Sequence, residues 1–335
     1  MRKILSLKNV LIVTDVAAPQ VNGVRRTLEN TARVLQARGH KVTFIAPPDY
    51  RSVPMPFYSE IKLALPPYHL TEERLDAYDA VHIATEGPLG LAARRTVEKY
   101  MIQFTTAYHT NFPAYMQKMW KVPERYSYKY LRWFHEPSDA MMVPTRSMLS
   151  LLETKGFVNA VHWGRGVDQT LFKPRKVVDI HIGPRPYFLN VGRVSEEKNL
   201  PDFLKLDLPG TKIVIGSASS LKTLKKLQKA YPKTVFLGGM TGLPLAEWYN
   251  RADVFVFPSI SDTYGLVNAE AISSGLPVAA YPVIGPIDIV QHGVTGFLDN
   301  DLAVAAKSAL TLGSVHGEFS WEIATDQFFN NLSFR

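Results

Sequence analysis

The chain has 335 residues, of which 46% are hydrophobic and 20% are charged, a composition typical of a folded globular protein. This length exceeds that of one ordinary hydrophobic core, so we expect two domains. Because the sequence contains no cysteine, it excludes a disulfide framework, a thiolate metal site and a cysteine nucleophile. No apolar run is long enough to span a bilayer, and Lys8 and Asp15 interrupt the apolar N-terminal segment, which argues against a signal peptide.

The net charge of +8 is distributed unevenly along the chain. Residues 1–174 hold 23 Lys and Arg against 15 Asp and Glu (23 − 15 = +8), and residues 175–335 hold 15 of each, so they are neutral. Such asymmetry indicates a surface in the first half that meets an anionic partner, either nucleic acid or an anionic membrane. The alternative is that long solvated helices produce the imbalance by chance.

In the first half, short apolar runs alternate with helical patterns. This alternation is typical of βαβ units and predicts a parallel sheet. The expected strands are residues 10–14, 41–46, 80–83 and 103–107, and the expected helices are residues 25–37, 89–100 and 126–134.

The second half repeats this scheme after a polar, proline-punctuated seam at residues 173–186. We therefore expect an α/β protein with two doubly wound domains, the first over residues 1–174 and the second over residues 175–317. A final helical pattern covers residues 321–332, with Ser320 as its start signal. The strands expected in the second domain are residues 187–191, 212–215, 235–237, 254–257 and 278–281.

Two carboxylates, Asp262 and Glu270, stand eight positions apart around a Thr-Tyr-Gly turn. The strand at residues 254–257 ends just before Asp262, and a helix over residues 269–274 carries Glu270. Doubly wound sheets bind ligands at this edge, because loops and helix N-termini there offer unpaired N–H groups to an anion. The alternative is a tight turn with a capping acid.

Two cations, Arg193 and Lys198, follow the end of the strand at residues 187–191. A guanidinium and an ammonium at the carboxyl edge of a sheet suit a pyrophosphate. The alternative is a pair of surface cations that bind Glu196 or Glu197.

Two further positions follow strand ends in the first half. Gly23 lets the backbone approach an anion at a helix N-terminus, although a plain strand–helix connection would look the same. His109 comes immediately after a strand, where a lone histidine is more often structural than catalytic. The sequence has no G-x-G-x-x-G motif, which argues against a dinucleotide enzyme.

Taken together, these motifs resemble those of one known family of proteins. The set G-R-x4-K-N, D-T-Y-G-L-V-x2-E-A-x3-G-L-P-V and Gly296-Phe297 resembles the retaining glycosyltransferases of family 4, which have the GT-B fold. The chain looks closest to bacterial mannosyltransferases and to relatives that glycosylate diacylglycerol. The resemblance implies two Rossmann-like domains that face a central cleft. It also implies that residues 175–317 bind the donor and that the C-terminal helix, about residues 318–335, returns to the first, acceptor-binding domain.

The resemblance also implies roles for individual residues. Asp262 matches the acid that contacts the donor sugar, and Glu270 matches the acid that holds the ribose hydroxyls. Arg193 and Lys198 match the cations that neutralise the departing diphosphate, which would lower the barrier to its departure. The other implied donor-binding positions are Gly23, through its backbone, His109, near the donor sugar, and Thr263, Tyr264, Gly265, Leu266 and Val267. One departure is that most of the wider family has Glu where this chain has Asp262.

The triplet Asp299-Asn300-Asp301 spells the D-x-D motif of metal-dependent glycosyltransferases with a different fold. Here it precedes an expected helix, so we interpret it as a loop and an N-cap. Cationic side chains already neutralise the diphosphate in this kind of site, so we expect no metal and no cofactor beyond a UDP- or GDP-sugar as co-substrate.

The stretch at residues 118–134 interleaves five cations with six aromatic residues. Trp and Tyr favour the bilayer interface, and Lys and Arg reach anionic headgroups. We therefore expect a cytoplasmic enzyme, peripheral on the inner face of the cell membrane, that glycosylates a lipid such as diacylglycerol. Aromatic core positions on an exposed cationic helix would give the same pattern. Other interpretations are a mannosyltransferase with a glycan acceptor, a sugar-nucleotide epimerase and, least favoured, a nucleic-acid-binding protein.

Overall fold

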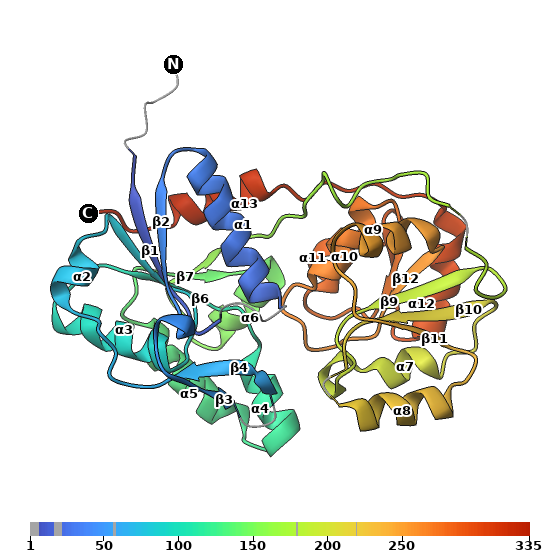
Figure 1. The fold of residues 1–335 in the computed structure, drawn as a ribbon, viewed down its shortest axis with the longest axis horizontal. Coiled ribbons are helices and arrows are strands. Elements are labelled where there is room, and N and C mark those ends of the chain that lie inside the picture. The colour runs from blue at the N-terminus through green and yellow to red at the C-terminus, as the bar shows by residue number, and fades with distance from the viewer. Residues whose placement is uncertain (1–6, 17–21, 56–57, 179, 219) are drawn as a thin grey trace. The chain divides into compact units, whose positions relative to one another are not determined.

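The computed structural model describes residues 7–16, 22–55, 58–178, 180–218 and 220–335. The chain divides into two compact units, one of Met1–Arg165 with Trp321–Arg335 and one of Gly166–Ser320 (Figure 1). The division comes after Arg165 rather than at the expected seam after residue 174. The reason is packing, because Val167 and Phe172 are buried in the core of the second unit and the Val167 N–H donates to the Phe319 carbonyl (2.8 Å).

The first unit contains a six-stranded, wholly parallel sheet in the order β2-β1-β5-β6-β7-β8. From the central strand β1 the chain first adds β2 at one edge. It then crosses to the other side of β1, where β5, β6, β7 and β8 follow in order to the opposite edge. The elements are β1 (Asn9–Val13), α1 (Gly23–Ala37), β2 (Lys41–Ile45), β3 (Ser52–Met55), β4 (Tyr58–Ala64), α2 (Glu72–Asp76), β5 (Ala80–Ile83), α3 (Pro88–Lys99), β6 (Thr105–Ala107), α4 (Phe112–Trp120), α5 (Glu124–His135), β7 (Ala140–Val143), α6 (Arg146–Thr154), β8 (Ala160–His162) and α13 (Trp321–Asn330).

Both faces of this sheet are covered, which explains why β1 is apolar from Val10 to Val13. On β1, Val10 and Ile12 pack into one core, and Leu11 and Val13 pack into the other. Alternate side chains of a strand point to opposite faces, so a strand buried on both sides carries either apolar residues or polar residues with hydrogen-bond partners, such as His82 and Thr105. The short antiparallel pair β3–β4 lies outside this sheet and was not expected from the sequence.

The C-terminal helix α13 belongs to the first unit and packs against α1. Trp321 and Ala324 are buried against Val34 of α1, and Arg38 forms an ion pair with Asp326 (2.6 Å). Further along, Phe328 packs into the same core as Val10 and Ile12. Residues far apart in the sequence therefore complete one hydrophobic core.

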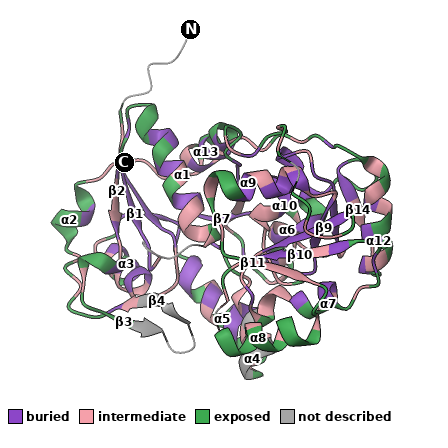
Figure 2. Cartoon of the chain, turned by 45° about the vertical axis from the view of Figure 1, so that its right-hand side comes forward, coloured by how far each residue is buried: buried purple, intermediate pink, exposed green. Residues whose placement is uncertain are grey.

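The second unit repeats the architecture with the strand order β11-β10-β9-β12-β13-β14, again wholly parallel. Figure 2 shows the strands of both sheets as mostly buried, whereas helices such as α2 expose much of their surface. The elements are β9 (Tyr187–Val191), α7 (Leu200–Leu204), β10 (Thr211–Ile215), α8 (Leu221–Ala230), β11 (Val235–Gly238), α9 (Gly242–Arg251), β12 (Val254–Phe257), α10 (Leu266–Ser273), β13 (Val278–Ala280), α11 (Pro286–Ile289), β14 (Gly296–Leu298) and α12 (Leu302–Ala309).

Each sheet reverses its direction of growth once, between β1 and β5 in the first unit and between β9 and β12 in the second. Loops that leave neighbouring strands in opposite directions at such a point open a crevice at the carboxyl edge, where α/β proteins bind ligands. The fold therefore predicts a binding site at the ends of β9 and β12, and a second group of functional residues near the ends of β1, β5 and β6.

Candidate active site

An ion pair lies at the point where the second sheet reverses. Lys198 follows β9, Asp262 follows β12, and the Lys198 Nζ atom donates to the Asp262 Oδ1 atom at 2.6 Å. Both side chains are partly exposed, at 26% and 20%. The structure thus brings together two of the predicted site residues, which are 64 positions apart in the chain.

The loop that carries Lys198 is fastened to the end of β12 by its neighbour Asn199. Asn199 has a left-handed backbone (φ 50°), and its amide donates to the Pro258 carbonyl (3.1 Å) and to the Asp202 carboxylate (2.6 Å). Asparagine tolerates this conformation better than most residues. Asn199 therefore fixes the position of the ammonium beside Asp262.

Asp262 is held ionised by its neighbours. Burial alone would raise the pKa of this carboxyl, but the charge and the hydrogen bond of Lys198 oppose it and prevail. The Ser259 hydroxyl and the Arg193 guanidinium lower the pKa further, so that it lies below its usual value. An ionised carboxylate in this position accepts hydrogen bonds from hydroxyl groups and does not donate a proton.

Arg193, the second predicted cation, pairs with a carboxylate of its own loop. Its Nη2 atom donates to the Glu197 Oε1 atom (3.0 Å), which also accepts a hydrogen bond from the Ser195 hydroxyl (2.6 Å). This is the contact expected from the alternative interpretation of Arg193 as a cation paired with a nearby acid. The Arg193 side chain remains 39% exposed, so the guanidinium is accessible to an anion.

Glu270, the second predicted acid, has a different environment from Asp262. It lies within α10 and is buried, and its Oε2 atom accepts a hydrogen bond from the Tyr249 hydroxyl of α9 (3.0 Å). The two acids therefore have separate partners, a cation for Asp262 and a phenol for Glu270. Sequence reasoning did not identify Tyr249, because nothing near it in the chain marks it as a partner of Glu270.

Helix α10 begins at Leu266, three residues before the expected start at Ala269. Gly265 precedes it with a left-handed backbone (φ 83°), and a Cβ atom there would lie 2.7 Å from the Asn268 amide nitrogen. Only glycine fits this turn without strain. The N–H groups of Leu266 and Val267 thus lie in the first turn of a helix, where they have no acceptor within the helix. Tyr264 and Val267 also pack against the core of this unit, and Thr263 lies in the loop after Asp262.

In the first unit, Gly23 is exposed at the start of α1. The preceding residue, Asn22, caps the helix by accepting a hydrogen bond from the Arg25 N–H (2.9 Å). Residues 17–21, in the segment between β1 and Asn22, lie outside the described residues. The described residues place Gly23 at a helix N-terminus near the reversal point of the first sheet. Helix N-termini in general favour anions such as phosphate.

His109 follows β6 and is partly buried. The Arg165 Nη2 atom lies 3.2 Å from its Nδ1 atom, and the ring meets the Trp163 ring edge-on with centroids 5.7 Å apart. Burial, then the charges of Arg165, His82 and His135, hold the pKa of His109 well below its usual value. The imidazole is therefore neutral at physiological pH.

Asp15 is a buried carboxylate that the sequence did not single out. It follows β1, and its oxygens accept hydrogen bonds from the N–H groups of Leu89 (2.8 Å) and Gly90 (3.3 Å) and from the Thr85 hydroxyl (2.8 Å). Burial raises the pKa of Asp15 despite these bonds. Its position directly after a predicted strand was the signal that could have identified it.

The side chains of the D-x-D triplet form hydrogen bonds within the triplet and with the helix that follows it. The Asp301 Oδ1 atom accepts hydrogen bonds from the N–H groups of Ala303 (2.8 Å) and Val304 (3.4 Å), so Asp301 is the N-cap of α12. The Asp299 carboxylate in turn accepts the Asp301 N–H (2.8 Å). The capping role predicted for the triplet is confirmed.

Within the basic and aromatic stretch, α5 divides its aromatic residues between two environments. Tyr128 and Phe134 are buried, whereas Tyr126 and Trp133 are 55% and 45% exposed. The core interpretation thus holds for the first pair, and the second pair faces outward. The side chains of residues 118–120 lie outside the described residues.

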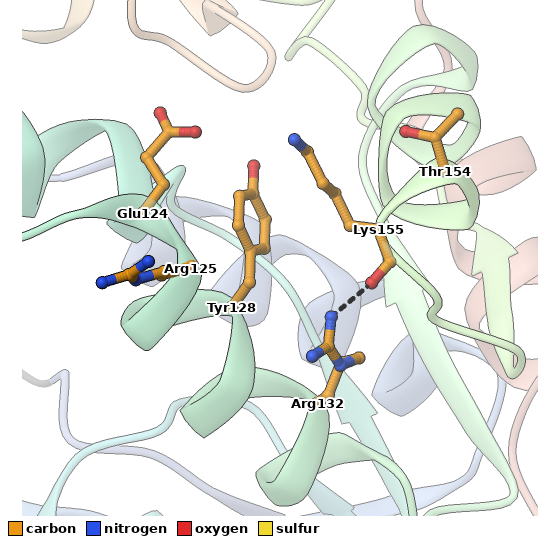
Figure 3. A pocket seen from close by; sticks show the side chains of 6 residues that line it. All are labelled: Glu124, Arg125, Tyr128, Arg132, Thr154 and Lys155. Atoms are coloured by element: carbon orange, nitrogen blue, oxygen red, sulfur yellow. Dashed lines mark hydrogen bonds between the residues drawn. The ribbon is translucent and has the colours of Figure 1, made fainter.

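A polar cavity of about 360 Å³ lies between α5 and the end of α6 (Figure 3). The Lys155 ammonium is 5.1 Å from the centroid of the Tyr128 ring, and the Arg132 guanidinium donates to the Lys155 carbonyl (2.6 Å). Figure 3 shows Glu124, Tyr128 and Lys155 extending their polar ends in the same direction. The cavity is therefore of mixed charge and is not a purely cationic site. Its lining residues are Glu124, Arg125, Tyr128, Arg132, Thr154 and Lys155.

Two wholly parallel six-stranded sheets, each with helices on both faces, define a pair of Rossmann-like domains, and solved glycosyltransferases of the GT-B type share this fold. One is sucrose-phosphate synthase from Thermosynechococcus elongatus (TM-score 0.73, 20% identity, covering 96% of this chain and 98% of that one). Among the described residues, no helix is both long and apolar enough to cross a bilayer. The chain thus has the GT-B fold.

The chain belongs to the family 4 glycosyltransferases. The family model described as Glycosyltransferase Family 4 matches residues 21–171, and that described as Glycosyl transferases group 1 matches residues 178–306. Three relatives illustrate the range of the family. The sulfoquinovosyl transferase SQD2 of Arabidopsis thaliana is 32% identical, over 84% of this chain and 61% of its own length. A GDP-mannose-dependent alpha-mannosyltransferase of Mycobacterium tuberculosis is 28% identical, over 86% of this chain and 83% of its own length. An alpha-monoglucosyldiacylglycerol synthase of Streptococcus pneumoniae is 25% identical, over 89% of this chain and 77% of its own length.

Proposed function

We propose that this protein transfers a hexosyl group from a UDP- or GDP-sugar to a membrane lipid such as diacylglycerol, with retention of anomeric configuration. The observation that carries the proposal is the Lys198–Asp262 pair at the reversal point of the second sheet, with Arg193 in the same loop as Lys198. This pair places a fixed cation and an ionised carboxylate side by side. The cation suits a diphosphate, and the carboxylate suits sugar hydroxyls.

In the proposed reaction, the bond between the anomeric carbon and the diphosphate oxygen breaks, and the nucleoside diphosphate leaves with the electron pair. The acceptor hydroxyl oxygen bonds to the anomeric carbon, and its proton passes to the oxygen of the departing diphosphate. Lys198 can stabilise the leaving group without losing Asp262, because an ammonium has three donors and Asp262 uses one. The partly exposed Arg193 provides a second positive charge as negative charge develops on the leaving oxygen.

The two acids then have distinct tasks. Asp262 accepts hydrogen bonds from the donor sugar, and its lowered pKa keeps it an acceptor at neutral pH. Glu270 holds the ribose hydroxyls, and the Tyr249 hydroxyl fixes the orientation of its carboxylate. No metal enters this scheme, because the cationic side chains already supply the charge that the diphosphate requires.

A lipid acceptor is supported by two kinds of observation. One of the relatives, the alpha-monoglucosyldiacylglycerol synthase, bears the name of a lipid-glycosylating enzyme. In addition, α5 exposes Arg125 and Lys129 together with Tyr126 and Trp133, a combination suited to an anionic membrane surface. We propose that the enzyme works as a peripheral protein on such a surface.

A direct test incubates the purified protein with UDP-glucose, GDP-mannose and other UDP- and GDP-sugars, each with diacylglycerol, and detects products by mass spectrometry. We expect one donor to give a glycosyldiacylglycerol, and NMR of the product should show the donor's anomeric configuration. Inversion at the anomeric carbon would contradict the retaining mechanism. Absence of a sugar–lipid product from every donor would contradict the lipid acceptor.

A second candidate function is the transfer of mannose to a glycan or to another glycolipid. The GDP-mannose-dependent relative supports it, because this chain covers 83% of that protein's length. The same experiment separates the two proposals when an oligosaccharide and a preformed glycolipid are added as acceptors. Product formation from GDP-mannose on these acceptors alone would favour the second candidate.

The membrane proposal has its own test with a matched control in the chain. Helix α8 is also cationic and carries four lysines, among them Lys225 and Lys229, without a buried residue. We expect the wild-type protein to sediment with phosphatidylglycerol liposomes at low salt and to be released at high salt. Charge reversal of Arg125 and Lys129 should abolish sedimentation, and charge reversal of Lys225 and Lys229 should not. The opposite pattern would move the membrane surface to α8, and indifference to lipid charge would refute the proposal.

A further inference from the structure

The contact between Arg165 and His109 determines where the histidine carries its proton. Arg165 follows β8 and His109 follows β6, both within the first unit. The Arg165 Nη2 atom lies 3.2 Å from the His109 Nδ1 atom. A guanidinium has only donors, so Nδ1 must accept the hydrogen bond and cannot carry a proton itself. In a neutral imidazole the remaining proton is then on Nε2.

The arginine is held in one orientation. Its side chain is buried, its Nη1 atom donates to the carbonyls of Trp163 (2.5 Å) and Gly164 (2.9 Å), and its guanidinium lies 4.2 Å from the centroid of the Trp163 ring. The same indole packs edge-on against the His109 ring. Trp163 is itself completely buried, so arginine, indole and imidazole form a rigid group.

The surroundings oppose a second proton on His109. The fixed positive charge of Arg165 lies next to the ring, and the two other titratable groups that act on it are the imidazoles of His82 on β5 and His135 on α5. An imidazolium at His109 would face the guanidinium across the same hydrogen bond. Protonation is thus unfavourable, and the ring is a poor general base.

We propose that Arg165 is a positioning residue that holds His109 in the neutral Nε2–H tautomer, so that His109 meets the donor sugar as a hydrogen-bond donor and not as a base. This inference rests on the proposed function and on the family resemblance, which implies that His109 lies near the sugar of a UDP- or GDP-sugar. The His109 Nε2 atom is shielded from solvent in this structure. A sugar hydroxyl can reach this atom only when the side chains that cover it move, and it then meets little competing water.

The first test reads the tautomer directly, without substrate. Histidine labelled with 15N is incorporated into the full chain, and the His109 ring nitrogens are assigned from the signals that disappear in His109→Gln. We expect the Nδ1 resonance of an unprotonated nitrogen and the Nε2 resonance of a protonated one, unchanged from about pH 6 to about pH 8. Arg165→Met should move both resonances, whereas Arg132→Met, which also removes a guanidinium bound to a carbonyl, should move neither. An Nδ1–H tautomer in the wild-type protein would overturn the inference.

The second test asks whether the tautomer matters for transfer. In His109→Gln the amide nitrogen reaches the position of Nε2 and remains a donor, whereas in His109→Asn it reaches only the position of Nδ1. We expect His109→Gln to retain about 10-fold more kcat/KM than His109→Asn, with the donor that the substrate panel identifies. Equal loss in both variants would indicate a base and would overturn the proposal.

A double-mutant cycle isolates the role of Arg165. Arg165→Met should lower kcat/KM about 10- to 100-fold in the wild-type background, but by less than about 3-fold in His109→Gln, because glutamine has no tautomer to fix. A merely structural arginine would cost the same in both backgrounds, and that result would refute the positioning role. If the tautomer is confirmed and His109→Ala transfers at the wild-type rate, the failure lies in the proposed contact with the sugar.

Discussion

The two units have the same sheet architecture but arrange charge differently at their carboxyl edges. In the second unit, Lys198 and Arg193 each pair with a carboxylate, and all four side chains retain some exposure. In the first unit, the buried or partly buried imidazoles of His82 and His109 both lie under the influence of one guanidinium, Arg165. Paired, accessible ions can exchange partners when a charged ligand arrives, whereas a buried neutral ring offers one fixed donor or acceptor. This comparison supports the proposal that Lys198 and Arg193 of the second unit bind the charged diphosphate, whereas His109 of the first unit acts as a neutral hydrogen-bond donor.

The largest expected effect comes from breaking the ion pair of the second unit. Asp262→Ala should reduce kcat by at least about 10³-fold, because it removes the sugar-binding carboxylate and leaves the Lys198 ammonium without its counter-charge. The control is Asp326→Ala, which removes a carboxylate that also pairs with a cation at 2.6 Å but lies on α13. Steady-state kinetics and circular dichroism check both variants. Near-wild-type turnover of Asp262→Ala would remove this residue from the site.

Arg193→Ala should lower kcat by about 10²-fold or more, because the departing diphosphate loses one of its two cations. Glu197→Gln should cost less than about 10-fold, since the amide oxygen still accepts a hydrogen bond from Arg193 while the cation itself remains. The two variants are compared in the same transfer assay. A larger loss for Glu197→Gln than for Arg193→Ala would mean that the carboxylate, and not the guanidinium, contacts the donor.

The neutral histidines of the first unit predict a pH dependence of stability. Burial, followed by the charge of Arg165, lowers the pKa of His82 to about 3, against a reference value of 6.5. Between these two pH values, His82 binds a proton in the unfolded chain but not in the folded protein. The contribution to stability is therefore complete above about pH 6.5 and declines by about 1.4 kcal/mol per pH unit as the pH falls toward 3.

His82→Gln should remove this part of the slope. Urea unfolding at several pH values, followed by tryptophan fluorescence, measures the slope for both proteins. Only the difference between the two slopes is used, because Asp15, whose pKa is raised by burial, contributes with the opposite sign. Identical slopes in wild type and variant would show that His82 is accessible to protons in the folded state.

The smallest expected effect concerns the D-x-D triplet. Asp301→Ala should destabilise the protein by about 1 kcal/mol through loss of the α12 cap, without changing kcat. Neither wild type nor variant should lose activity in EDTA. Loss of transfer on chelation, restored by a divalent cation, would contradict the cap-only role of Asp301.

The sequence predicted elements best where an apolar run is bounded by polar or proline residues. The bounds of β9 and β12 are those expected, and β5 likewise matches residues 80–83. The start of α10 was misplaced, because the hydrophobic pattern does not show that Gly265 ends the turn in a left-handed conformation. The β3–β4 pair was missed, since it lies outside the parallel sheets and β3 contains Pro54, which is uncommon in the middle of a sheet.

For the site, the sequence could place residues at strand ends but could not assign their partners. The contacts Lys198–Asp262 and Arg165–His109 join residues 64 and 56 positions apart. Each depends on which strands are neighbours, and strand order is not encoded in a local pattern. Arg165 carries no motif of its own, so its contact with His109 emerges only once β6, β7 and β8 are paired.

The buried cap formed by Asp15 has a consequence for how this chain can vary. A Cβ atom at Gly87 would lie 2.5 Å from the Asp15 Cγ atom, so the loop before α3 has room for this carboxylate only if residue 87 has no side chain. Positions 15 and 87 are therefore coupled across two separate loops. We expect them to covary among homologues, so that chains that lose the acid at 15 also relax the requirement for glycine at 87. Grafting either loop alone into a related enzyme should fail, and exchanging both together should succeed.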